Sequence, residues 1–254
     1  MANPRILYLN RTIGATITAS AEDSGYPDDN LGDWREYEKW QGSAANSYTI
    51  IINLGSAASV TAFALVGHNL NTCGARYKLE AGTDDITFGT AVVAYTTPAT
   101  DRSLADYFTN PGKQYLQLTI DNNGGAVFTP SIGVLFLGDY LTMERLPETP
   151  LDPDEIEDVK EELINETGSL IGAIIDHTLR RQSWSFKWLT QAWVTATWLP
   201  FLRTYRNLPF IFHWDVDTDT AAVYLVRFSN NTHTAPYVDS YRTLSFSLIG
   251  RFEP

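Results

Sequence analysis

The stretch YTIIINLGSAASVTAFALVGHNL, from Tyr48 to Leu70, decides the predicted fold. Two apolar, β-branched runs, 49–54 and 60–66, are separated by a Gly-Ser turn signal at 55–56, and the second run stops at Gly67. Two such runs joined by a short connection predict neighbouring strands that pair with each other. Because both runs are apolar on both faces, we expect central rather than edge strands.

Similar strand signals continue on both sides of this stretch. The further predicted strands of the first half are residues 11–20, 76–81, 90–95, 114–120 and 132–140. Short strands joined by turn-rich loops, without a helical pattern, predict an all-β antiparallel sandwich of jelly-roll type.

One loop in this half, SGYPDDNLGDWREYEKWQGS at 24–43, is unusually long. Loops of this length are either functional or pinned by their own aromatic side chains. For Trp40 we favour a place in the core, whereas for Trp34 and Tyr37 a core position and an exposed contact position both remain open.

The same loop carries an acidic cluster of Asp28, Asp29 and Asp33. Such a cluster suits a hard cation, but it also suits an Asx-rich turn with a helix cap. We favour the turn, and we expect neither a bound metal nor a cofactor.

The composition changes near Pro147, Pro150 and Pro153, which predicts a linker between domains 1–146 and 147–254. Residues 156–164 fit either an acidic strand or a short helix. Residues 178–189 alternate and predict a strand whose aromatic side chains at 184, 186 and 188 face the core. Further predicted strands are 210–214, 222–228 and 241–252.

A helix is predicted at about 190–207, because Val194, Trp198, Phe201 and Tyr205 form one stripe at helical spacing. Pro200 lies inside it, so the helix either kinks there or begins late with proline in its first turn. The second domain is therefore predicted to be a β-sandwich or split barrel with one packed helix.

The second domain holds more tryptophan than a small domain easily buries. The candidates for an interface between subunits are Trp193, Trp198 and Arg203.

The net charge of −12 argues against nucleic acid and against an anionic membrane surface as direct partners. No apolar run approaches the roughly 20 residues that span a bilayer, and the N-terminus is too short and polar for a signal peptide. The single cysteine, Cys73, excludes an intramolecular disulfide and fits assembly in a reducing cytoplasm.

No motif of a known catalytic type is found in the sequence. The four histidines, His68, His177, His213 and His233, stand alone, and a structural role is favoured for each. The DVDTD segment at 215–219 lacks the Gly and Glu of a calcium loop and is predicted to be a polar turn. We therefore expect no enzyme.

Several segments of the sequence resemble known protein families. YPDDNLGDWREYEKWQGS, then residues 48–70, QYLQLTIDNN and IGVLFLGDYL resemble the discoidin-like (coagulation factor 5/8 type C, galactose-binding-like) jelly roll over residues 10–141. The variant is similar to copies found in tailed-phage virion proteins. In the second half, WSFKW, FLRTYRN, PFIFHWD and SFSLIGRFE follow in an order similar to distal tail and baseplate-hub proteins, whose domain resembles the tail-tube fold.

The resemblance implies a structural component of a phage tail, in a distal tail, baseplate or tail-tip ring. The implied partners are further copies of the chain, as a homotrimer or homohexamer, and other phage tail proteins, and the implied location is the virion, after assembly in the host cytoplasm. The alternative is a lectin-like module for host glycans. In either case the contact residues are expected at Trp34, Arg35, Tyr37 and Lys39. A glycosidase would need two carboxylates across a cleft, and neither half resembles one.

Overall fold

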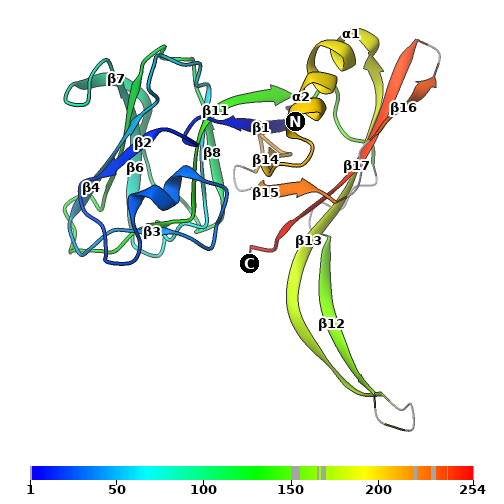
Figure 1. The fold of residues 1–254 in the computed structure, drawn as a ribbon, viewed down its shortest axis with the longest axis horizontal. Helices are drawn as coiled ribbons and strands as arrows, with labels where there is room; N and C mark the ends of the chain where they lie inside the picture. Colours follow the sequence, from blue (N-terminus) through cyan, green and yellow to red (C-terminus); the bar gives the residue numbers. More distant parts are fainter. Residues whose placement is uncertain are drawn as a thin grey trace. The chain divides into compact units, whose positions relative to one another are not determined.

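The computed structural model describes residues 2–149, 155–164, 166, 170–219, 222–229, 233–238 and 240–253. The chain forms two compact units (Figure 1). Unit 1 consists of Arg5–Leu141 and His213–Val223, and unit 2 consists of Ala2–Pro4, Thr142–Phe212 and Tyr224–Pro254. Along the chain the first division thus falls after residue 141, and each unit also takes in a segment from the other end of the sequence.

Unit 1 is a β-sandwich of two sheets. One has the order β8 (Leu104–Tyr107), β5 (Ala62–Val66), β11 (Val134–Thr142), β1 (Arg5–Asn10). The other has the order β2 (Thr16–Ala19), β4 (Ser47–Asn53), β9 (Tyr115–Asp121), β6 (Arg76–Gly82), β7 (Phe88–Thr96). A short pair, β10 (Ser131–Ile132) with β3 (Trp40–Gln41), and the 3₁₀ helix η1 (Asp28–Gly32) complete the unit.

The two strands of the 48–70 stretch lie in different sheets, so the predicted pairing between them is wrong. β4 pairs with β2 and β9, and β5 pairs with β11 and β8. Both are central in their sheets, as predicted. The connection at 54–61 passes from one sheet to the other, because each strand has an apolar face that is buried only when it is placed against the opposite sheet.

The core of unit 1 fills the space between the sheets. Alternate residues of each strand point into it, among them Ile50 and Ile52 of β4, Leu116, Leu118 and Ile120 of β9, Phe63 and Leu65 of β5, and Leu135 and Leu137 of β11. β5 is buried along its whole length, which accounts for its uninterrupted apolar sequence. The predicted all-β sandwich is confirmed.

The sequence prediction missed three strands of this unit, β1, β3 and β8, and overextended β2. β1 precedes the predicted strand at 11–20, which forms only over the four residues of β2. β8 has just four residues, and each is half-buried, so it shows no periodic pattern.

Unit 2 has a sheet in the order β12 (Ile156–Ile164), β13 (Leu170–Thr190), β17 (Tyr241–Arg251), β15 (Val223–Phe228), β14 (Phe210–His213), and β16 (His233–Val238) also pairs with β17. The open choice at 156–164 is thus decided in favour of a strand. β16 was not predicted.

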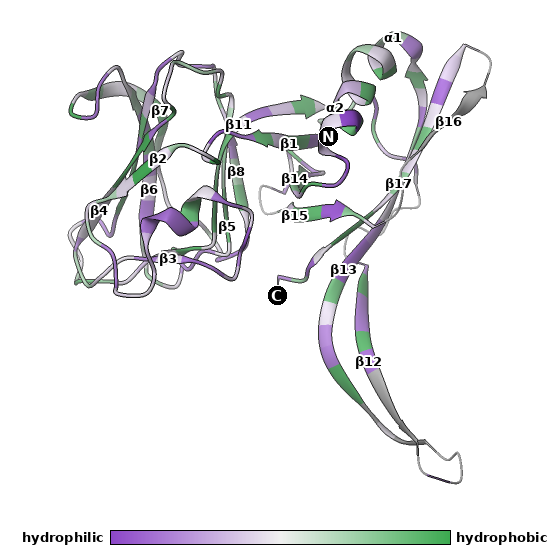
Figure 2. Cartoon of the chain, in the orientation of Figure 1, coloured by the Kyte–Doolittle hydropathy of each residue, from purple (hydrophilic) through white to green (hydrophobic). Residues whose placement is uncertain are grey.

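The outer half of β13 forms a two-stranded arm with β12 (Figure 1). β17 pairs with β13 only from Leu179 onward, so residues 170–178 of β13 pair with β12 alone among the described strands. Figure 2 shows hydrophobic (green) and hydrophilic (purple) segments along both strands of this arm.

The predicted core position of Trp188 is wrong. Trp184 and Phe186 are buried as predicted, but the register between β13 and β17 shifts after Phe186. Trp188 adopts a positive φ of 62° and is 54% exposed, while Leu189 takes the buried position. The register shift between β13 and β17 therefore reverses which side chains of β13 face the core after Phe186.

The helix runs without a break from Gln191 to Tyr205 as α1 (Gln191–Trp193), a π-helical segment (Val194–Trp198) and α2 (Leu199–Tyr205). It does not begin late at Pro200; its regular α-helical turns are instead interrupted by the π-helical segment just before this residue. Proline cannot donate to the carbonyl four residues earlier, and the wider π turn just before it gives its ring room. The Thr190 side chain caps the first turn by accepting from the Trp193 N–H at 3.2 Å.

The predicted stripe of this helix packs against the sheet of unit 2. Val194, Trp198 and Phe201 are buried, and Tyr205 is half-buried. Trp198 stacks on Phe246 of β17 with ring centroids 5.6 Å apart. The predicted β domain with one packed helix is confirmed.

Candidate functional site

The loop at 33–39 leaves η1 and lies over β11 and the end of β5. The half-buried Trp34 packs on Phe136 of β11, with ring centroids 6.0 Å apart. Glu36 approaches two glycines: a Cβ on Gly133 would lie 2.7 Å from its carbonyl oxygen, and a Cβ on Gly67 would lie 3.0 Å from its Cγ. Because these two positions have no Cβ, the loop can lie close to the sandwich.

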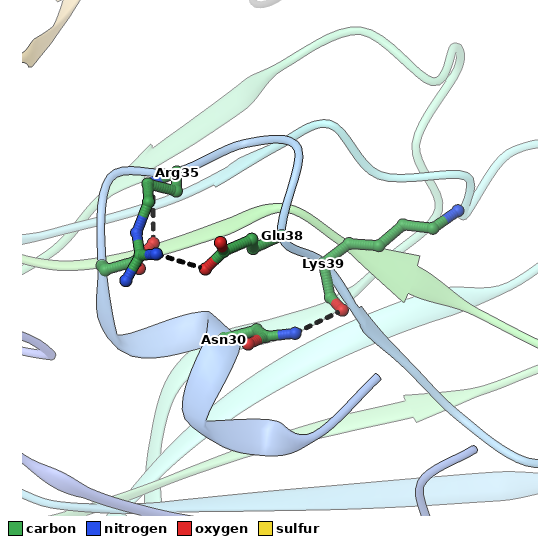
Figure 3. A network of polar contacts seen from close by, with 5 residues as sticks. Asn30, Arg35, Glu38 and Lys39 are labelled. Atoms are coloured by element: carbon green, nitrogen blue, oxygen red, sulfur yellow. Dashed lines mark hydrogen bonds and ion pairs between the residues drawn. The ribbon is translucent and has the colours of Figure 1, made fainter. Parts of the chain in front are cut away.

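Arg35 is the centre of a charged network on this loop (Figure 3). Its Nε lies 2.7 Å from Oδ2 of Asp33, and its Nη1 lies 2.6 Å from Oε2 of Glu38. The Asp33 carboxylate also accepts from the Arg35 backbone N–H at 2.7 Å. Two carboxylates thus fix one planar guanidinium, which remains more than half exposed.

Tyr37 stands at the tip of the loop with 78% of its surface exposed. An interaction with the Tyr37 hydroxyl is the largest cause that raises the pKa of Arg35 above its ordinary value, followed by the charges of Asp33 and Glu38. The exposed ring therefore belongs to the same short loop as the charged network.

Lys39 follows with its side chain directed away from that network (Figure 3). Its ammonium lies 5.7 Å from the ring centroid of Tyr26, and its carbonyl oxygen accepts from the Asn30 amide at 3.0 Å. The structure leaves Arg35 and Tyr37 exposed on this loop, packs the half-buried Trp34 on Phe136, and places the Lys39 ammonium near the ring of Tyr26. Trp40 is fully buried in the core against Tyr48, as predicted.

Two members of the predicted acidic cluster, Asp28 and Asp33, already have partners in the protein. Asp28 accepts from the Ala19 N–H at 2.7 Å, and Asp33 is engaged by Arg35. In the part of the chain that the structure describes, no three His, Cys, Asp or Glu side chains are grouped as a metal ion would require.

Two histidines are buried in unit 1. His213 donates to or accepts from the Tyr107 hydroxyl at 2.9 Å through Nδ1 and contacts the Asp219 carbonyl at 3.3 Å through Nε2. His68 accepts from the Leu70 N–H at 3.4 Å, which is a structural role of the kind that the sequence favoured. Burial lowers the pKa of both side chains. The DVDTD segment forms a turn in which Asp215 accepts from the Thr218 N–H at 3.2 Å.

The candidates for a subunit interface differ in accessibility. Trp198 is fully buried inside unit 2, so it is not available to another chain, and this candidate is corrected. Its place in the helical stripe explains the burial. Trp193 is half-buried and stacks on Trp198, and Arg203 is exposed. Among the described residues no helix is long and apolar enough to cross a bilayer.

Sequence reasoning missed one group of exposed residues, around Trp188 in unit 2. The strict alternation of 184, 186 and 188 gave no sign of the register shift that exposes this side chain. The following sequence did carry a signal, because Leu189 is apolar where the alternation requires a polar residue.

Comparison of the sequence with protein-family models and with curated proteins finds no match. Solved structures with a similar arrangement correspond to about half of the chain. One is the chitosan-binding module 1 of a chitosanase/glucanase from Paenibacillus sp. IK-5, with 20% identity and a TM-score of 0.45 over 52% of this chain and 100% of that one.

Two others are a fucose binding module from Streptococcus pneumoniae and CpGH89CBM32-5 from Clostridium perfringens. The first has 11% identity and a TM-score of 0.44 over 52% of this chain and 95% of that one. The second, solved in complex with GalNAc-beta-1,3-galactose, has 14% identity and a TM-score of 0.43 over 53% and 99%. At these identities and scores the likeness carries no argument about what this chain binds.

Proposed function

We propose that unit 1 is a binding module, without catalytic activity, that recognises carbohydrate through the loop at 33–39. The observation that carries this proposal is that one short loop carries both the exposed Tyr37 ring and Arg35, whose guanidinium two carboxylates hold in place. An aromatic ring offers a flat apolar surface to the C–H face of a sugar, and a fixed fork of N–H groups offers donors to its hydroxyls. Trp34 anchors this pair to the sandwich.

The geometry favours a rigid recognition surface. Asp33 and Glu38 restrict the rotamers of Arg35, so little side-chain freedom remains to be lost on binding. Two of the similar structures are themselves named as carbohydrate-binding modules, one for chitosan and one for fucose. The proposal itself rests on the loop.

We expect Tyr37→Ala to weaken binding to an immobilised glycan at least about tenfold, because truncating an exposed aromatic anchor removes most of its contact area. Tyr37→Phe keeps the ring and is expected to retain most of the affinity. A glycan array followed by isothermal titration calorimetry on the strongest hit measures both effects.

The matched control is Ile86→Ala, which removes an apolar side chain that is 85% exposed elsewhere in unit 1. It should leave the affinity unchanged. If Tyr37→Ala, still folded, binds every array glycan as the parent protein does, the loop is not the site.

A second candidate function is assembly into a ring of a phage tail, and the arm formed by β12 and β13 favours it. A two-stranded hairpin is marginally stable in water by itself. This arm exposes about half of the surface of Ile156, Ile174 and Ile175. The unpaired edge of the arm and its exposed apolar side chains favour pairing with the arm of another copy of the chain.

For this candidate we expect the protein in solution to have the mass of a homotrimer or homohexamer. A double change, Ile174→Asp with Ile175→Asp, places charge on the arm and should shift the mass to that of a monomer. Analytical ultracentrifugation measures the mass, and Ile86→Asp in unit 1 is the control. A parent protein that stays monomeric at all concentrations would contradict the assembly role and leave the glycan proposal intact.

A further inference from the structure

An open cavity of about 420 Å³ lies on unit 2. Its lining comes from three segments that the fold brings together: the N-terminal residues, the chain after β11, and the end of β13. The lining residues are Asn3, Glu144, Arg145, Leu146, Glu148, Lys187 and Trp188. This volume suits a ligand of the size of one or two sugar rings.

Trp188 is the aromatic wall of the cavity. Its indole is 54% exposed and meets the ring of Tyr241 edge to face, at 5.9 Å between centroids and 81° between planes. Its φ of 62° lies in the left-handed region, which is a true outlier for a bulky residue. The unfavourable φ lowers the stability of the fold, and so does the exposure of a large apolar side chain. Strained backbone of this kind is concentrated at binding sites.

Three polar side chains of the cavity, Glu144, Glu148 and Lys187, are fixed by ion pairs and hydrogen bonds. Lys187 Nζ lies 2.6 Å from Oε1 of Glu148, and Ser185 donates to Oε2 of Glu148 at 3.0 Å. Lys187 lowers the pKa of Glu148, which keeps it as a carboxylate. Glu144 accepts from the Thr190 N–H and hydroxyl at 2.6 and 2.7 Å.

The lining is balanced in charge. The carboxylates Glu144 and Glu148 are matched in number by the cations Arg145 and Lys187, so the lining has no net charge and offers both hydrogen-bond donors and acceptors. A charged ligand meets no excess of opposite charge in such a lining, whereas a neutral ligand with many hydroxyls can satisfy groups of both kinds.

We propose that this cavity is a second saccharide site, which takes a neutral mono- or disaccharide stacked on Trp188 and hydrogen-bonded to Glu148, Lys187 and Asn3. It is independent of the loop at 33–39, because the two sites belong to different units.

The test uses the full chain with Tyr37→Ala, so that only the second site is measured. Lactose, cellobiose and N,N′-diacetylchitobiose are titrated by calorimetry, with glucosamine and glucuronic acid as charged probes. We expect at least one neutral disaccharide to bind, and adding Trp188→Gly should weaken this binding at least about tenfold. Because glycine is relaxed at positive φ, the same change should keep or raise the melting temperature.

The matched control is Asn123→Gly, which relieves the other positive φ of a non-glycine residue, 55°, among the described residues. It should raise stability without changing saccharide affinity. The proposal is overturned if no neutral disaccharide binds, if Trp188→Gly leaves binding unchanged, or if the charged probes bind better. It is also overturned if Trp188→Gly lowers the solution mass, since Trp188 would then be a subunit contact. If Tyr37→Ala does not weaken glycan binding but Trp188→Gly does, only the site at the loop 33–39 is refuted.

Discussion

Gly138→Ala is expected to lower the free energy of unfolding of unit 1 by about 3 kcal/mol or more. Gly138 lies on β11, where a Cβ would be 1.8 Å from the Leu9 carbonyl oxygen and 2.8 Å from the Leu9 carbonyl carbon. Both atoms are backbone atoms of β1, so no rotamer change relieves the overlap. The two strands must move apart, although β11 also pairs with β5 on its other side and bounds the core.

Urea denaturation followed by circular dichroism measures this loss, and failure to accumulate as soluble protein is its extreme form. Gly89→Ala on β7 is the matched control, because nothing lies within 4 Å of a Cβ at that position. It should change the free energy of unfolding by less than about 0.5 kcal/mol. If the two variants unfold at the same urea concentration, β1 and β11 do not approach each other as described.

Acid is expected to destabilise unit 1 through His68. This side chain is 4% exposed, and burial lowers its pKa from 6.5 to about 4. Above pH 6.5 the imidazole is neutral in the folded and the unfolded chain. As the pH falls from 6.5 toward 4, only the unfolded chain takes up the proton, so stability decreases with falling pH.

This shift corresponds to a loss of roughly 3 kcal/mol across the window. Burial also lowers the pKa of His213, which acts in the same direction. Urea denaturation at pH 7 and near pH 4.5 measures the slope.

His68→Asn should flatten this pH dependence, because its amide oxygen can still accept from the Leu70 N–H but does not titrate in this range. His177→Asn is the control, since His177 lies on the arm of unit 2 and is exposed. An unchanged slope in His68→Asn would show that another group governs the acid sensitivity. Carboxylates titrate in both variants and so cancel in the comparison.

The period-two patterns predicted burial well wherever one face of a strand meets the core. In β9, Leu116, Leu118 and Ile120 are buried as the alternation requires. The helical stripe of Val194, Trp198 and Phe201 is buried for the same reason. Such patterns predict which face of a strand or helix is buried, because side-chain direction follows the local backbone period.

The candidate loop was predicted in part. Its length and its aromatics singled out Trp34 and Tyr37, but the sequence left open which of these rings is exposed. The Asp33–Arg35–Glu38 network depends on the turn that brings Glu38 back to Arg35, and local composition does not specify such a turn.

Residue chemistry and periodicity were enough to predict an all-β chain with one amphipathic helix, and to predict which faces of most of its strands are buried. They were not enough to predict that the two strands of 48–70 belong to opposite sheets, or that Trp188 is exposed while Leu189 is buried in its place. The physical reason is that burial follows from a residue's own chemistry, whereas the choice of partner strand and register is settled by distant segments that compete for the same edge.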